Sequence, residues 1–365
     1  MAEQKNTIVI LIPGFAKDEQ DMNCLPMQQS FILALKRTNP DAQLRILTFE
    51  YPHHQRPYDW HGIPVIPLGG RNRRGLWRSL LYRKAVTVLQ EIRKKEHIAG
   101  LLSFWTGFTA EVATRFGRKY NIPHLNWIMG QDARPGNKYA LRNNYRADEL
   151  VALSDSLQER YERSYGIRPA YVITPGISVM QVPPDLAQQS LRIIGAGSLI
   201  PLKRFDLFID VITEVRKKIP LLDAVIFGNG PLRETLQQQI VRAGMQDVIR
   251  LEGEVGHETL LHHMQQSRVL LHPSSFEGFS GVCLEARSAG IPVISYCQPM
   301  KEEMPGWYTA PDKQSMIQML VTELVLPQEP VPLEWHTMED TAKEIMRILL
   351  THHNASSAPA SLSTV

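Results

Sequence analysis

The most informative stretch of the sequence is Pro273-Ser-Ser-Phe-Glu277-Gly-Phe-Ser-Gly281-Val-Cys-Leu-Glu285-Ala-Arg-Ser-Ala-Gly290-Ile-Pro-Val293. It follows an apolar run, Val269–His272, which predicts a buried strand. Ser280 stands where the N-cap of a helix is expected, and Gly290 followed by Pro292 marks the end of that helix. A strand, a loop and a helix in this order are typical of a parallel α/β sheet.

The same alternation continues on both sides of this stretch. Strands are predicted in the N-terminal half at Thr7–Pro13, Leu44–Phe49, Pro64–Leu68, Ile98–Trp105, His124–Met129, Leu150–Ser154 and Tyr171–Thr174. In the C-terminal half they are predicted at Leu191–Ile194, Leu222–Phe227, Ile249–Leu251, Val269–His272 and Pro292–Tyr296. Helices are predicted at Leu25–Arg37, Leu76–Lys94, Phe108–Tyr120, Ser156–Tyr165, Phe205–Lys218, Pro231–Ala243, Glu258–Gln266 and Gly281–Ala289. Strands separated by helices favour right-handed crossovers, so we predict an α/β fold with two Rossmann-like, doubly wound domains facing a central cleft.

The length of 365 residues also favours two domains, because it exceeds what one ordinary core contains. Thr174–Gly176 predicts a turn and Val182–Pro184 a linker. We therefore predict an N-terminal domain over residues 1–180 and a C-terminal domain over residues 181–330. Residues 331–352 are predicted to carry a final helix, Thr337–Thr351, that packs back toward the N-terminal domain. The small, polar residues 353–365 are predicted to be disordered.

The composition excludes several classes of protein. The chain has 40 basic and 37 acidic residues and a formal net charge of +3, so we expect no nucleic-acid partner. Three widely spaced cysteines favour neither a disulfide framework nor a zinc site. The N-terminus lacks the pattern of a signal peptide, and no apolar stretch approaches the ~18 residues that a membrane span needs. We therefore expect a cytoplasmic protein.

The loop and helix start after Val269–His272 favour the binding of an anion. A helix N-terminus presents backbone N–H groups without intrahelical partners, and here they run from Phe279 through Ser280 and Gly281 to Val282. Gly278 and Gly281 leave room for close approach to the backbone. Two carboxylates, Glu277 and Glu285, bracket the site and suit pairs of sugar hydroxyls. The alternative is an ordinary helix start with exposed glutamates, which the combination of features makes the weaker interpretation.

This segment resembles the E-x7-E signature of glycosyltransferase family 4. It matches at Glu277, Gly278, Phe279, Glu285, Ala286, Gly290, Pro292 and Val293, and departs at Ser280, where glycine is usual. The resemblance implies the two-domain GT-B fold and retention at the anomeric carbon. It also implies that Glu277 contacts the transferred sugar and Glu285 the ribose of a nucleotide.

Further motifs of this family lie upstream, in the family's order. Gly195-Ala-Gly-Ser-Leu-Ile-Pro-Leu-Lys203 resembles the segment whose lysine faces the diphosphate, although Ser198 replaces the usual arginine. Gly228-Asn-Gly-Pro231 resembles the family's G-x-G-P turn, and Leu251–Val255 the segment that meets the base. The resemblance covers roughly residues 150–300. It implies that Lys203 stabilises the departing diphosphate and that Ser198 and Gly228 contact the donor.

The N-terminal half is expected to bind the acceptor and is less informative. Gly14 and Phe15 follow the first strand and are candidates for an acceptor-side loop. Asp132 resembles the aspartate of the family's H-G-x-D region, with Met129 in place of the histidine, and is a candidate catalytic residue; a turn aspartate is the alternative of equal weight. Arg71–Lys84 interleaves arginines with leucines and a tryptophan, which favours either peripheral contact with the inner face of an anionic membrane or a solvated helix packed through its leucines.

The sequence therefore predicts a retaining hexosyltransferase for polysaccharide or glycolipid synthesis. The donor is a nucleoside diphosphate sugar, and the acceptor is a hydroxyl of a glycan or a lipid-linked acceptor. No D-x-D motif stands in a suitable loop, so no metal and no other cofactor is expected. Two alternatives stay open: a non-catalytic sugar-nucleotide-binding protein, and another GT-B enzyme such as a phosphorylase or a nucleotide-sugar epimerase.

Overall fold

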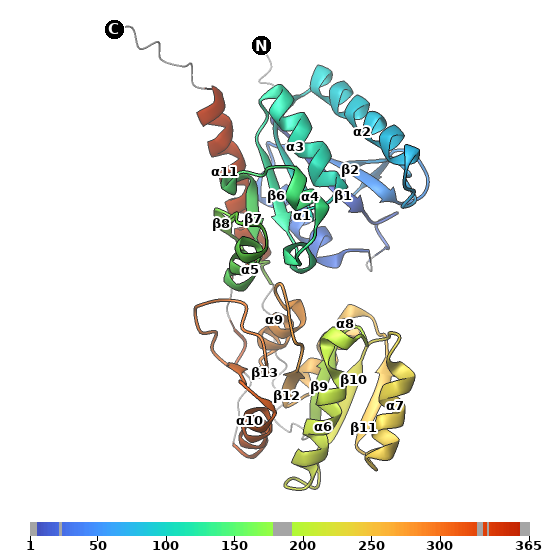
Figure 1. Cartoon of the computed structure of the whole chain (residues 1–365), viewed down its shortest axis with the longest axis vertical. Coiled ribbons are helices and arrows are strands. Elements are labelled where there is room, and N and C mark those ends of the chain that lie inside the picture. The colour runs from blue at the N-terminus through green and yellow to red at the C-terminus, as the bar shows by residue number, and fades with distance from the viewer. Residues whose placement is uncertain (1–5, 22–23, 178–191, 327–330, 334–335, 358–365) are drawn as a thin grey trace, which may run out of the picture. The chain divides into compact units, whose positions relative to one another are not determined.

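The computed structural model describes residues 6–21, 24–177, 192–326, 331–333 and 336–357. The chain divides into two compact units, Met1–Gly176 with His336–Val365, and Ile177–Trp335 (Figure 1). Each unit is described by itself. The predicted linker Val182–Pro184 and residues 358–365 of the predicted tail lie outside the described residues.

Unit 1 contains an eight-stranded sheet in the order β3-β4-β2-β1-β5-β6-β7-β8. The strands are β1 (Asn6–Gly14), β2 (Gln43–Tyr51), β3 (Tyr58–Trp60), β4 (Ile63–Pro67), β5 (His97–Phe104), β6 (His124–Ile128), β7 (Leu150–Ala152) and β8 (Tyr171–Val172). Its helices are α1 (Pro26–Thr38), α2 (Leu76–Lys95), α3 (Phe108–Tyr120), α4 (Lys138–Arg142), α5 (Asp155–Tyr165) and α11 (Met338–Ser357). The sequence order reverses between β1 and β5, as in a doubly wound sheet.

Unit 2 contains a six-stranded sheet in the order β11-β10-β9-β12-β13-β14. The strands are β9 (Arg192–Ala196), β10 (Asp223–Phe227), β11 (Ile249–Gly253), β12 (Val269–His272), β13 (Val293–Ser295) and β14 (Trp307–Thr309). The helices are α6 (Phe205–Arg216), α7 (Arg233–Arg242), α8 (His257–Gln265), α9 (Gly281–Ser288) and α10 (Lys313–Val325). Counted along the unit, the strand order is 3-2-1-4-5-6, the Rossmann order, and every pair is parallel.

Apolar side chains cover both faces of the unit 2 sheet. Along β9, Ile193 packs into one buried cluster with α6, while Ile194 packs into another with α9. This alternation follows from the period of two in a strand, and it explains why β9 reads as a continuous apolar run. The sheet is therefore a fixed platform, and the loops at the carboxyl ends of its strands are the parts left to bind a ligand.

The structure confirms the predicted parallel α/β fold and corrects several elements. β3 pairs antiparallel with β4 through a two-residue turn, His61–Gly62, with positive φ at both residues. That strand is too short to give a period-two pattern. β14, α4 and α10 were not predicted, although Asp312 caps α10 by accepting a hydrogen bond from the Ser315 N–H at 2.7 Å.

The last helix is longer than the sequence predicted. α11 runs from Met338 to Ser357, so it ends beyond the predicted helix boundary at Thr351. In unit 1, α11 packs against α1 and β5, and Arg37 on α1 forms an ion pair with Glu339 at 2.5 Å. Helix α11 thus completes the core of the unit that holds the N-terminus. Among the helices formed by the described residues, none is long and apolar enough to cross a membrane.

Candidate donor site in the second unit

The candidate site lies at the carboxyl edge of the unit 2 sheet, where β9 and β12 are neighbours. The strand order reverses between these two strands, so the chain leaves their carboxyl ends in opposite directions and opens a crevice. The loop after β9 leads to a short 3-10 helix, Pro201–Lys203, and the loop after β12 leads to Glu277 and α9. The topology therefore brings together two motifs that are far apart in the sequence.

Backbone contacts fix these loops to one another. The Gly197 N–H donates to the Phe227 carbonyl at 2.9 Å, and the Leu199 N–H donates to the Asn229 carbonyl at 2.9 Å. Gly228 has φ +135°, and a Cβ at that position would collide with the Gly197 carbonyl. Gly228, predicted as a donor contact, thus has a packing role that explains the glycine without any ligand.

Glu277 lies between two hydrogen-bond donors from different strand ends. The Lys203 Nζ is 2.6 Å from Glu277 Oε1, and the His272 Nε2 is 2.9 Å from the same oxygen. The Glu277 side chain is 14% exposed and His272 is 3% exposed, so the contacts are largely shielded from water. The lysine stem passes over Gly197, where a Cβ would lie 3.5 Å from the lysine Cε.

The charge of this cluster follows from its surroundings. Burial alone would raise the pKa of Glu277, but the hydrogen bonds from His272 and Lys203 and the charge of Lys203 outweigh it and lower the pKa to about 2. Burial lowers the pKa of His272, so its ring is neutral near pH 7 and its Nε2 carries the proton that faces the carboxylate. The sequence pointed to Glu277 and Lys203 but not to His272, because a histidine that ends a buried strand reads as a core residue.

Helix α9 begins at Gly281, as predicted, but Ser280 does not cap it. Ser280 occupies the N-cap position without a side-chain hydrogen bond to the helix, and its Oγ lies 3.3 Å from His272 Nε2. A Cβ at Gly281 would meet no atom within 4 Å, so the helix start is open. At the other end, Gly290 has φ +89° and its N–H donates to the Arg287 carbonyl, which terminates the helix as expected.

The other residues that were predicted to contact the sugar donor differ in their surroundings. The side chains of Phe279 and Val282 pack against the core of unit 2, which leaves their backbone groups for a ligand. Ser198 is exposed, and Gly278 is buried. Glu285, one turn into α9, has an Oε1 that is 3.0 Å from the His257 Nε2 at the start of α8. The hydrogen bond to Glu285 raises the pKa of His257.

In unit 1 the predicted acceptor-side residues are mostly structural. Phe15 is fully buried and its ring packs edge-on against Trp60 with 4.8 Å between the ring centres, so its side chain belongs to the core; Gly14 ends β1. Asp132 is 3% exposed, and its Oδ2 accepts hydrogen bonds from the backbone N–H groups of Thr106 (2.9 Å) and Met129 (2.8 Å). Burial raises the pKa of Asp132 to about 6. These bonds account for Asp132 as a tie between two loops, and its catalytic role stays a prediction.

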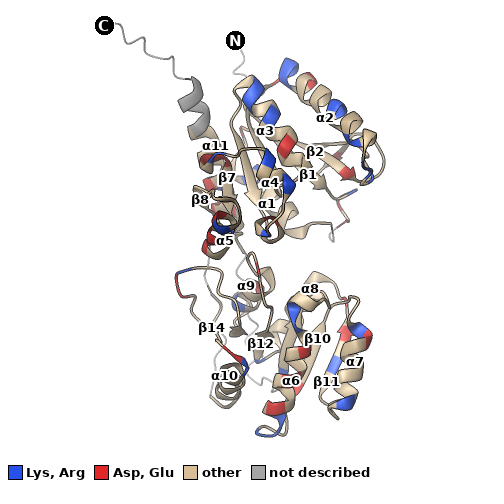
Figure 2. Cartoon of the chain, in the orientation of Figure 1, with Lys and Arg blue, Asp and Glu red and all other residues tan. Residues whose placement is uncertain are grey.

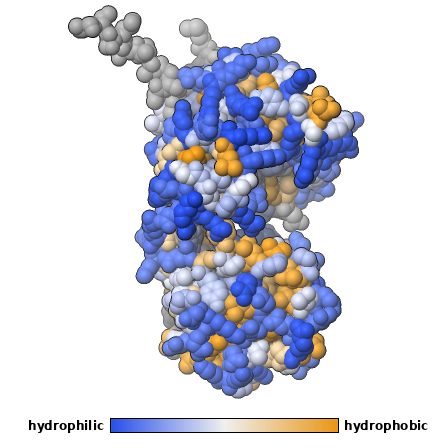
Figure 3. Space-filling view, in the orientation of Figure 1, coloured by the Kyte–Doolittle hydropathy of each residue, from blue (hydrophilic) through white to orange (hydrophobic). Residues whose placement is uncertain are grey.

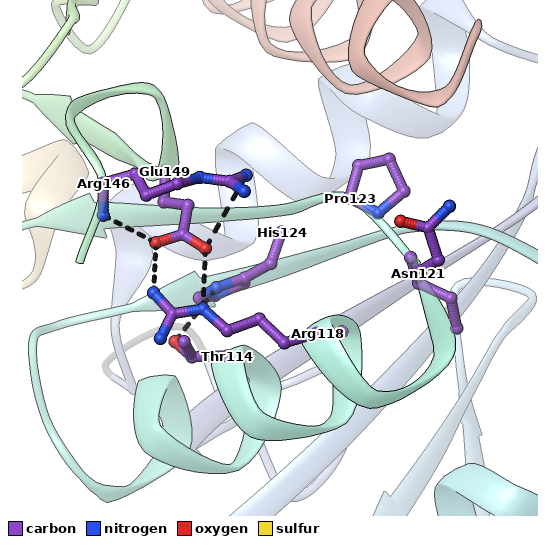
Figure 4. A pocket seen from close by; sticks show the side chains of 9 residues that line it. Thr114, Arg118, Asn121, Pro123, His124, Arg146 and Glu149 are labelled. Atoms are coloured by element: carbon purple, nitrogen blue, oxygen red, sulfur yellow. Dashed lines mark hydrogen bonds and ion pairs between the residues drawn. The ribbon is translucent and has the colours of Figure 1, made fainter. Parts of the chain in front are cut away.

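A small cavity of about 140 Å³ in unit 1 is also lined by structural groups (Figure 4). Glu149 is buried there and accepts hydrogen bonds from the Arg118 Nη2 at 2.8 Å and the Arg146 N–H at 2.8 Å. Arg118 also donates to the carbonyls of Asn143 and Asn144, so each of its three side-chain nitrogens has a partner. The charged side chains that line the cavity, Arg118, Arg146 and Glu149, are thus paired with one another, and Arg146 also pairs with Asp148.

The basic segment Arg71–Lys84 corresponds to a loop and the first half of α2 (Figure 2). Leu76 is 85% exposed, Trp77 55% and Leu80 53%, whereas Leu81 is buried. The alternative prediction, a helix that packs through its leucines, is therefore wrong for Leu76 and Leu80. Figure 3 shows an apolar patch over this part of unit 1, surrounded by hydrophilic surface.

Nothing in the described ranges gathers three or more His, Cys, Asp or Glu side chains in an arrangement that could hold a metal ion. The cysteines Cys24, Cys283 and Cys297 are not joined in disulfides.

Comparison with known sequences supports the resemblance. Residues 182–305 match the family model described as glycosyl transferases group 1. The 2-deoxystreptamine N-acetyl-D-glucosaminyltransferase of Niallia circulans is 33% identical over 99 residues, which are 27% of this chain and 25% of that protein. The D-inositol 3-phosphate glycosyltransferase of Streptomyces avermitilis is 30% identical over 173 residues, 41% of this chain and 37% of that protein. The matched region thus spans well under half the length of these relatives.

Comparison with solved structures extends the similarity to nearly the whole chain. Anabaena HepE in complex with UDP has a TM-score of 0.64 at 17% sequence identity, with 96% of this chain and 98% of that chain covered. The lipopolysaccharide outer core galactosyltransferase WaaB has a TM-score of 0.63 at 16% identity, with the same coverage. The fold is accordingly that of the GT-B glycosyltransferases, built from two Rossmann-like α/β domains.

Proposed function

We propose that this chain is a retaining glycosyltransferase of family 4, which transfers a hexose from a nucleoside diphosphate sugar to a hydroxyl of a glycan or a lipid-linked acceptor. The observation that carries the proposal is the Lys203–Glu277 pair at the strand-order reversal of unit 2, 2.6 Å apart and beside the open start of α9. A cation, a carboxylate and unpaired backbone N–H groups are the groups that a sugar diphosphate requires.

In the proposed reaction, the bond from the anomeric carbon to the diphosphate breaks and a bond from the same carbon to the acceptor oxygen forms on the same face. The proton of the acceptor hydroxyl goes to the departing phosphate oxygen. Lys203 and the N–H groups of α9 stabilise the charge that develops on the diphosphate. Glu277 binds hydroxyls of the hexose and forms no covalent bond to it.

Glu285 is proposed to bind the ribose hydroxyls, in keeping with its position one turn into α9. Its present partner, His257, is half-exposed and can release the carboxylate at small cost. UDP is named in the structure of the similar HepE, so uridine is the first base to test. The diphosphate charge is balanced by Lys203, and we propose that the reaction requires no divalent metal.

Product analysis tests the reaction. The chain is incubated with UDP sugars labelled at the anomeric carbon and with simple alcohols or glycans as acceptors, with and without a metal chelator. We expect a glycoside with the donor's anomeric configuration and an equal rate in the chelator. An inverted product would refute retention, loss of turnover in the chelator would refute metal independence, and an epimerised donor would identify the alternative enzyme. Donor binding without any turnover would favour the non-catalytic alternative.

We also propose that α2 contacts an anionic membrane surface through Leu76, Trp77 and Leu80. These side chains are exposed, and Arg73 stacks on Trp77 at 4.7 Å between its guanidinium carbon and the ring centre. Apolar side chains beside arginines suit the boundary between lipid headgroups and acyl chains. Sedimentation with vesicles of neutral or of 30% anionic lipid tests this, with Trp77→Ser beside the wild type. Equal pelleting with both lipids, or by both proteins, would contradict it.

A further inference from the structure

His272 is the last residue of β12, at the carboxyl edge of the sheet where the candidate site lies. Its side chain is 3% exposed, and its Nε2 lies 2.9 Å from Glu277 Oε1 and 3.3 Å from Ser280 Oγ. A buried histidine with a polar ring atom aimed at a functional carboxylate requires an explanation, since an apolar residue would fill the same space at the end of a buried strand without the cost of burying a polar ring.

The two oxygens of Glu277 are in different situations. Oε1 faces both His272 and Lys203. Among the described residues, the hydrogen bonds to the Glu277 side chain come from Lys203 and His272, and both go to Oε1 rather than to Oε2. One oxygen therefore fixes the side chain, and the other stays available for the hydroxyls of a sugar.

The two donors to Oε1 also differ in what a bound diphosphate would do to them. The Lys203 ammonium is drawn to a diphosphate, because two phosphates carry more negative charge than one carboxylate. His272 is neutral, buried and out of reach of the solvent, so a phosphate has no comparable attraction for it. When Lys203 turns to the diphosphate, His272 is the donor that remains on Glu277.

We propose that His272 is a positioning residue, which holds Glu277 Oε1 through its Nε2–H so that Oε2 points to the transferred sugar after Lys203 engages the diphosphate. This inference rests on the proposed function. The titratable groups around Glu277 are His272 on β12 and Lys203 on the short helix after β9; the Cys283 thiol on α9 lies near them, and burial raises its pKa.

The decisive variants are His272→Leu, which keeps the volume without the donor, and His272→Gln, which restores an N–H at a similar distance. His263→Leu is the matched control, because His263 packs on Phe227 in the same unit and its Nδ1 has no hydrogen-bond partner. At saturating donor, we expect kcat to fall by about 100-fold in His272→Leu, as for a group displaced by about 1 Å, and to recover at least about tenfold in His272→Gln. A loss of stability alone would affect His263→Leu equally.

A second readout is independent of turnover. Carboxyl-labelled glutamate gives a nuclear magnetic resonance titration of Glu277, identified by its absence in Glu277→Gln. In His272→Leu, loss of the donor should raise the pKa of Glu277 and shift the acid limb of the pH–rate profile to higher pH. In His272→Gln and His263→Leu, Glu277 should titrate as it does in the wild type. An unchanged Glu277 titration in His272→Leu overturns the inference. If the Glu277 titration shifts in His272→Leu but the wild type transfers no sugar, the proposed function is overturned instead.

Discussion

At the scale of single residues, Lys203 has two partners in the proposed mechanism: the Glu277 carboxylate and the diphosphate of the donor. Without a ligand it pairs with Glu277, and its stem lies over Gly197. Lys203→Met keeps the stem and removes the charge. Because one preorganised group of this kind contributes about 10²- to 10³-fold, we expect kcat/KM to fall by that factor in steady-state kinetics. Lys313→Met, which removes an exposed ion pair with Asp210, is the control and should retain the wild-type rate.

Two glycines near the site should respond in opposite ways to alanine. Gly228→Ala places a Cβ against the Gly197 carbonyl at φ +135°, so we expect it to lower the free energy of unfolding by about 1–3 kcal/mol or more. Gly281→Ala meets no neighbouring atom, so stability should be kept while UDP binding weakens. Urea denaturation and calorimetry measure both. Equal stability of the two variants would contradict the described packing.

The buried carboxyl of Asp132 should make stability depend on pH. Its folded-state pKa is about 6, above the ordinary value, so the folded state holds the proton longer and the carboxyl's contribution to stability is lost as pH rises from about 4 through 6. Asp132→Asn retains an acceptor and cannot ionise. We expect the variant to gain up to about 3 kcal/mol relative to the wild type between pH 4 and pH 7, measured by urea denaturation. A pH-independent difference would show that Asp132 does not titrate in this range.

At the scale of elements, the contact between α8 and α9 should make donor binding depend on pH. Protonated His257 competes with the ribose for Glu285, and the pKa of His257 is raised above its ordinary value. Donor affinity should therefore increase as pH rises above about 6.5. Calorimetric titration of UDP from pH 6 to 9 measures this trend. His257→Ala should bind with a flatter pH profile, and an identical profile would separate His257 from the ribose site.

The helices and strands also show which parts of the fold and of the candidate site can be predicted from the sequence alone. Strands such as β1 and β12 are predictable because burial on both faces of the sheet requires a continuous run of apolar residues. The glycine at the end of α9 is predictable because that position has a positive φ. His272 was missed because its role appears only when β12 lies beside β9. The burial of the Phe15 side chain could not be predicted for the converse reason, because a residue that follows a strand can fold back into the core.

At the scale of the whole molecule, the C-terminal helix belongs to the unit of the N-terminus. The buried side chains of α11 include Ala342, Ile345 and Leu349, and a Cβ at Gly100 on β5 would contact Leu349 at 3.1 Å. Loss of each large side chain costs about 2–5 kcal/mol against a typical domain stability of 5–15 kcal/mol. A chain that ends at Trp335 should therefore lose the cooperative unfolding of unit 1, as followed by circular dichroism. A chain that ends at Ser357 is the control, and equal melting of the two would contradict the packing.

The central claim is that unit 2 binds a nucleoside diphosphate sugar through Lys203 and Glu277. The most direct measurement is the shift in melting temperature with a panel of nucleoside diphosphates and the corresponding nucleoside diphosphate sugars, taken on the wild type, Lys203→Met and Glu277→Gln. A ligand stabilises the state that binds it, so at least one donor should raise the Tm of the wild type. At a donor concentration of 100 Kd, the free energy of unfolding should increase by about 2.7 kcal/mol. Lys203→Met should lose the response to the diphosphate itself, and Glu277→Gln should lose only the added response to the sugar. No shift with any donor, or equal shifts in all three proteins, would contradict the claim.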